Sequence, residues 1–143
     1  MLRVLAGLLV ACAPFAAPAQ SIEPGLWEYT DVITDPRKPA LPTIRTQRRC
    51  LTKAVADSVE RWGPERPAHA QCTVKVLTST ATTATWEFDC PRLDDRGGAL
   101  SGTGSAAVSP GMVESEHNLT VRLKGNEFKS LLKRTGKHHG PCN

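Results

Sequence analysis

The chain is poor in aromatic residues, since tryptophan, tyrosine and phenylalanine make up only 5% of its 143 residues. It therefore lacks the interleaving of aromatic and basic side chains on which single-stranded nucleic acids stack, and we expect no nucleic-acid partner. It also lacks a strong excess of one charge, because 18 basic residues stand against 14 acidic ones. A mildly basic chain of this kind attracts anionic lipids or polyanions only weakly.

Motifs for catalysis are missing as well. Ser105 lacks the Gly-x-Ser-x-Gly frame of a nucleophile elbow, and no glycine-rich phosphate loop precedes a predicted helix. Asp94 and Asp95 are followed by two glycines, which is typical of a solvated turn. No cysteines have the Cys-x-x-Cys spacing of a zinc site, and we interpret His138 and His139 as part of a basic tail rather than as copper or zinc ligands. We expect no enzyme activity, no cofactor and no metal.

The only long apolar run lies at the start of the chain. Residues 4–12 are too few to span a bilayer, which takes about 20 residues. Residues 17–19 (Ala-Pro-Ala) supply the small side chains that signal peptidase reads, so we expect residues 1–19 to be a signal peptide and the mature periplasmic protein to begin at Gln20. In the alternative, residues 9–12 form a lipobox, and a lipid on Cys12 anchors the protein; otherwise we expect no stable membrane insertion.

Residues 20–143 are enough for one domain, and they contain four cysteines. An even number of cysteines in an oxidising compartment predicts disulfides. Cys72 opens one segment of alternating polarity and Cys90 closes the next. A hairpin that opposes them brings their Cα atoms to about 5.5 Å, the separation that a disulfide requires. By elimination, Cys50 pairs with Cys142.

The same hairpin register sorts the neighbouring side chains by polarity. Val74 then opposes Phe88, and Val76 opposes Trp86, on the side that carries the cysteines. Leu77 is the exception, because it falls on the other side. The polar residues of that side are Thr73, Lys75, Glu87 and Asp89.

Most of the remaining chain also has the composition of strands. We expect strands over 25–33, 44–51, 100–109 and 112–123, with a type II turn at Pro110 and Gly111. Thr52 is a suitable cap for a helix over 53–62. Local signals over the last stretch, 127–137, fit a helix slightly better than a strand. The predicted fold is mainly β: an antiparallel sheet of six or seven strands, curled toward an open barrel, with one short helix and two disulfides.

The turn at Pro110 places Gly104 opposite His117, on the inward side of its hairpin. An inward histidine is more often a satisfied core residue than a ligand contact. We expect a non-catalytic periplasmic binding module for an apolar or amphipathic ligand. The alternative is a protein-interaction or structural module of the cell envelope that has no small ligand, and in the simplest case the aromatic residues only form the core. The candidate ligand contacts are Trp27, Tyr29, Trp86, Phe88 and His117.

Several short motifs occur together in a defined order along the chain. They are residues 25–28 (Gly-Leu-Trp-Glu), 49–52 (Arg-Cys-Leu-Thr), 72–74 (Cys-Thr-Val), 101–104 (Ser-Gly-Thr-Gly) and 140–142 (Gly-Pro-Cys). This arrangement resembles the small exported bacterial proteins grouped as domain of unknown function 3617 (DUF3617). The resemblance implies an antiparallel β-fold with a final strand, so we expect a strand over 127–137. Residues 137–140 (Lys-His-His-Gly) depart from the Gly-Arg-Arg-like segment of the family, and the resemblance implies no activity.

Overall fold

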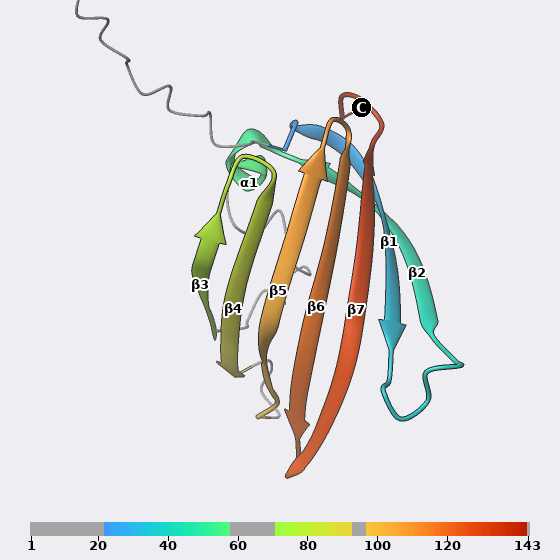
Figure 1. Cartoon of the computed structure of the whole chain (residues 1–143), viewed down its shortest axis with the longest axis vertical. Helices are drawn as coiled ribbons and strands as arrows, with labels where there is room; N and C mark the ends of the chain where they lie inside the picture. The colour runs from blue at the N-terminus through green and yellow to red at the C-terminus, as the bar shows by residue number, and fades with distance from the viewer. Residues whose placement is uncertain (1–21, 58–70, 93–96, 143) are drawn as a thin grey trace, which may run out of the picture.

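The computed structural model describes residues 22–57, 71–92 and 97–142. Seven strands form one antiparallel sheet in the order β2-β1-β7-β6-β5-β4-β3 (Figure 1). The strands are β1 (Gly25–Thr34), β2 (Thr43–Leu51), β3 (Gln71–Ser79), β4 (Thr83–Arg92), β5 (Ala99–Ser109), β6 (Met112–Leu123) and β7 (Asn126–His138), and the helix α1 spans Lys53–Ala56.

The chain builds the sheet from one edge and then from the other. In chain order, the β1–β2 hairpin comes first and lies at one edge of the sheet. The chain then crosses to the opposite edge, where β3 lies. Strands β3 to β7 then follow one another back across the sheet until β7 pairs with β1. The mainly β class, the seven strands, the short helix and the two disulfides confirm the prediction.

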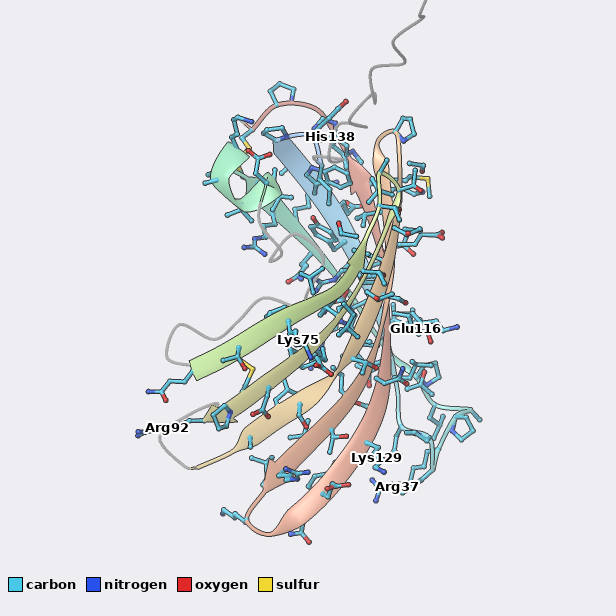
Figure 2. All side chains as sticks on the ribbon, turned by 60° about the vertical axis from the view of Figure 1, so that its left-hand side comes forward. Arg37, Lys75, Arg92, Glu116, Lys129 and His138 are labelled. Carbon is cyan, nitrogen blue, oxygen red and sulfur yellow. A yellow bond between two sulfur atoms is a disulfide. The ribbon has the colours of Figure 1, made fainter. Side chains whose placement is uncertain are left out.

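The predicted curl toward a barrel requires correction. The sheet is neither closed nor strongly curled, and β2 and β3 remain as two separate edges (Figure 2). Each pair of neighbouring strands in a twisted sheet is rotated by roughly 20–25°. Over seven strands this twist turns the two edge strands away from each other, so the edges do not pair.

The two hairpin registers predicted from the sequence are confirmed. Val74 opposes Phe88, and Val76 opposes Trp86, as the cysteine pair required. In the β5–β6 hairpin Gly104 opposes His117. Gly111 has a φ of +68°, the backbone conformation that the second central position of a type II turn requires.

Two further predicted segments can be compared with the structure. The last stretch is strand β7, as the family resemblance implied, and not the helix that its local pattern favoured. The predicted helix over 53–62 is described only in its first part, where the Val55 N–H donates to the capping Thr52 hydroxyl at 3.4 Å. Its later residues lie outside the described ranges. Across the described ranges, no helix is long and apolar enough to cross a membrane.

The two faces of the sheet differ in polarity. One face, which we call the core face, carries the buried side chains, and Val55 of α1 packs against it. The opposite or outer face carries ion pairs between neighbouring strands, and Figure 2 labels Lys75 and Glu116 from two of them. These pairs are Glu28–Arg48 at 2.8 Å, Lys75–Glu87 at 2.9 Å and Glu116–Lys133 at 3.4 Å.

Both predicted disulfides are present. Cys72 and Cys90 link β3 to β4 across 18 residues of sequence. Cys50 of β2 is joined to Cys142, which follows β7, across 92 residues. The longer link holds one edge of the sheet to the end of the chain.

Candidate functional site

The five residues predicted to contact a ligand all lie on the core face, where Trp27, Tyr29 and Trp86 belong to one core cluster and Phe88 packs against it. Trp27 and Tyr29 of β1 stack with ring centroids 6.2 Å apart. Trp86 of β4 and His117 of β6 meet edge to face at 5.4 Å. These four side chains are at most 5% exposed, so they form the core. Phe88 is the one of the five that is only partly buried.

Two glycines make room for large side chains of this core. The indole of Trp86 lies over Gly104 on the neighbouring strand, and a β-carbon at position 104 would overlap it. Tyr29 lies over Gly136 in the same way, because a β-carbon there would stand 2.7 Å from the tyrosine ring. Glycine on these strands therefore allows a ring to lie flat on the backbone of its neighbour.

His117 is a buried structural residue in this fold. It is fully buried, and its Nε2 lies 3.1 Å from the Ser115 hydroxyl, within hydrogen-bond distance. The structure therefore gives one ring nitrogen of His117 a polar contact within the core.

A buried ion pair was missed by the sequence analysis. Arg134 donates two hydrogen bonds to the carboxylate of Asp31, and its guanidinium stands 5.0 Å above the Tyr29 ring. Burial raises the pKa of the Tyr29 hydroxyl, and the charge of Arg134 partly offsets this shift. The sequence did contain an indication of this ion pair, because Asp31 follows Tyr29 by two residues in a strand and therefore points to the same face. A carboxylate on that face required a buried cation as its partner.

The part of the core face nearest the β6–β7 turn is apolar but less well covered. We call it the apolar strip; it consists of two rows of side chains that run across β3 to β7. Phe128 is 41% exposed and Val74 is 37% exposed, and the other members are half-buried. The strand registers place Val74, Phe88 and Leu119 in one row and Leu100, Val121 and Phe128 in the next.

A cation marks one end of the apolar strip. The guanidinium of Arg37 stands 5.9 Å above the ring of Phe128. Arg37 is itself held by the Asp35 carboxylate at 2.8 Å. The side-chain hydrogen bond from Arg37, aided by its backbone N–H, lowers the pKa of Asp35 to about 2. The strip thus presents an apolar surface that ends beside a fixed positive charge.

The described ranges contain no group of three or more histidine, cysteine or acidic side chains arranged to hold a metal ion. The histidine of the terminal motif, His138, packs on Trp27 with centroids 5.2 Å apart, and its Nδ1 lies 3.2 Å from Glu23. Its neighbour Cys142 forms a disulfide and so supplies no thiolate.

The fold can be compared with known proteins. The family model described as a protein of unknown function, DUF3617, matches residues 22–142, a range that includes all of the described residues and most of the chain. No curated protein and no solved structure gives a significant match. The matched segment runs from the residues before β1 to the terminal cysteine, and so includes both disulfides. The chain therefore belongs to the DUF3617 family.

Proposed function

We propose that the protein is a non-catalytic binding module whose apolar strip holds an apolar or amphipathic ligand. The observation that supports this proposal is the extent of the strip: six partly exposed apolar side chains lie in two neighbouring rows across five strands. In the first row Gly102 lies between Phe88 and Leu119. Exposed apolar surface of this extent is typical of an interaction site.

The energetics and the charge of the strip agree with such a ligand. Covering apolar surface gains roughly 25 cal/mol for each Å² removed from water, so a chain-like apolar molecule is stabilised along its whole length. Arg37 beside Phe128 then provides a partner for a polar or anionic head group. A ligand with an apolar chain and a polar end matches both features.

A neutral apolar dye, N-phenyl-1-naphthylamine, tests the proposal by its fluorescence on binding. We expect one dye per protein, and an affinity about fivefold lower in Val121→Thr, because the buried methyl becomes a hydroxyl. Val32→Thr is the matched control, since Val32 is also half-buried in a strand but lies on the outer face. Equal losses in both variants, or no dye binding by the unmodified protein, would refute the apolar strip as a binding site.

A second candidate is an envelope interaction module that has no small ligand. Its supporting observation is the edge strand β3, where Val76 is 44% exposed and Leu77 is 50% exposed. A free strand edge offers backbone donors and acceptors to a strand of another protein. Under this proposal, Val76→Lys removes an envelope protein that co-purifies with the chain and leaves dye binding unchanged. Native mass spectrometry of protein isolated from the periplasm distinguishes a retained small ligand from a retained protein.

The proposed place of action is the periplasm, after removal of residues 1–19 from the domain at 20–143. The cleavage site lies outside the described ranges, so the proposal depends on the signal-like sequence. The intact mass of the exported protein should correspond to a first residue of Gln20. A mass that corresponds to lipidated Cys12 as the first residue would instead assign the protein to a membrane surface.

A further inference from the structure

Two loops lie together at one end of the sheet. Strand β1 runs antiparallel to β7, and β7 runs antiparallel to β6, so the loop after β1 and the turn before β7 are at the same end (Figure 1). The contact of Arg37 with Phe128 joins the two loops, and Figure 2 shows Arg37 close to Lys129. We call residues 35–42 and 122–129 the basic end.

The basic end carries more positive than negative charge. It contains five basic residues and two acidic ones. The acidic residues, Asp35 and Glu127, pair with three of the cations. Lys38 and Lys124 are exposed and form no ion pair with any residue in the described ranges. The basic residues are Arg37, Lys38, Arg122, Lys124 and Lys129.

Large apolar side chains are exposed on and beside these loops. Leu41 is 77% exposed and Ile44, just beyond the loop, is 65% exposed; both values exceed those of the other described large apolar residues. Leu123, at the start of the other turn, is 40% exposed. Aliphatic side chains that project beside cations are typical of surfaces that enter the head-group region of a membrane.

The backbone at Lys124 gives an independent observation. Lys124 has a φ of +49° and Gly125 a φ of +79°, the conformation of a two-residue type I′ turn. The first position of such a turn strongly favours asparagine, aspartate or glycine, which tolerate a positive φ. A lysine at this position makes the turn less stable than asparagine would, and it places an unpaired charge at the tip of the hairpin.

We propose that the basic end docks the protein onto an anionic membrane surface. Lys38, Lys124 and their neighbours contact lipid phosphates, while Leu41 and Ile44 enter the boundary between head groups and acyl chains. A soluble polyanion satisfies the cations but leaves the two aliphatic side chains in water, so the combination favours a lipid surface. This surface adjoins the apolar strip, with which it shares Phe128 and Arg37. The residues that carry the membrane proposal, Lys38, Lys124, Leu41 and Ile44, lie outside the strip, so the proposal does not depend on the strip's ligand.

Sedimentation with vesicles tests the proposal, using protein whose intact mass excludes a lipid on Cys12. We expect binding to vesicles that contain phosphatidylglycerol, weakened by added salt, and little binding to phosphatidylcholine alone. Each basic residue near an anionic surface contributes about fivefold in affinity, so Lys38→Gln combined with Lys124→Asn should weaken binding by about 25-fold. Leu41→Ser combined with Ile44→Ser should weaken it without changing its dependence on salt.

The single change Lys124→Asn distinguishes an effect on vesicle binding from an effect on the stability of the fold. Asparagine suits the turn, so this variant should melt at a higher temperature while it binds the vesicles about fivefold more weakly. Lys137→Gln is the matched control, because it removes one exposed charge at the opposite end of β7 and should leave binding nearly unchanged. Three results would overturn the proposal: no binding to anionic vesicles, equal losses in the control, or binding to heparin without binding to vesicles.

Discussion

Arg134 of β7 and Asp31 of β1 lie directly opposite each other and are joined by two hydrogen bonds, at 2.6 and 2.8 Å, although 103 residues separate them in the sequence. The pair is buried in the core, next to the ring of Tyr29. It connects the first strand of the chain to the last. The pairing of β1 with β7 joins the β1–β2 hairpin to strands β3 to β7.

Removal of one member of this pair should be costly. Asp31→Asn removes the carboxylate charge to which the buried guanidinium of Arg134 donates two hydrogen bonds, so we expect a loss of about 3–5 kcal/mol in the free energy of unfolding. Replacement of both residues, by Asp31→Leu with Arg134→Met, should cost much less than the sum of the two single changes. Urea unfolding of the four proteins measures the coupling, and additive losses would show that the pair does not act as a unit.

Gly104→Ala tests the packing of an aromatic ring on a glycine. The added methyl would overlap the indole of Trp86, which must then shift within the core. We expect a loss of about 1–3 kcal/mol in stability and a weaker near-ultraviolet circular dichroism signal from tryptophan. Ser105→Ala, at the next position but exposed on the outer face, should leave both quantities unchanged. An unaltered tryptophan signal in Gly104→Ala would contradict this description of the core.

The two disulfides should differ in their contribution to stability. In the loop-entropy description, closure of the Cys50–Cys142 loop contributes about 4–5 kcal/mol, against about 3 kcal/mol for the shorter Cys72–Cys90 loop. Replacement of Cys50 and Cys142 by serine should therefore lower the melting temperature more than replacement of Cys72 and Cys90. The reverse order would mean that local packing in the β3–β4 hairpin outweighs chain closure.

The ion pair between Asp35 and Arg37 predicts a specific response to pH. Hydrogen bonds from Arg37 lower the pKa of Asp35 from 3.8 to about 2, so the pair stabilises the fold above pH 3.8 and this contribution is lost as the pH falls toward 2. Both groups are exposed, so we expect a small effect on stability and a clear one in a carboxyl NMR titration. In Arg37→Gln the pKa of Asp35 should rise toward 3.8; a titration midpoint that does not move would exclude Arg37 as the cause.

The sequence by itself determined the features that depend on short-range geometry. The register of the β3–β4 hairpin followed from Cys72 and Cys90, because a disulfide across a hairpin requires opposed residues. The register of the β5–β6 hairpin followed from Pro110 and Gly111, because a tight turn sets which residues meet. The period of two then placed the candidate aromatic residues and His117 on one face.

Tertiary structure decided the features that depend on partners distant in the chain. Phe128, Leu131 and Leu132 share one face of a helix, and the local pattern slightly favours one. The segment is nevertheless strand β7, because β1 and β6 offer it hydrogen bonds on both sides. The openness of the sheet depends on twist accumulated over all strands, which no local pattern encodes. The alternation of side chains along each strand predicted which of them point inward. Only the packing of the whole core face determined that Trp86 is buried and Phe88 partly exposed.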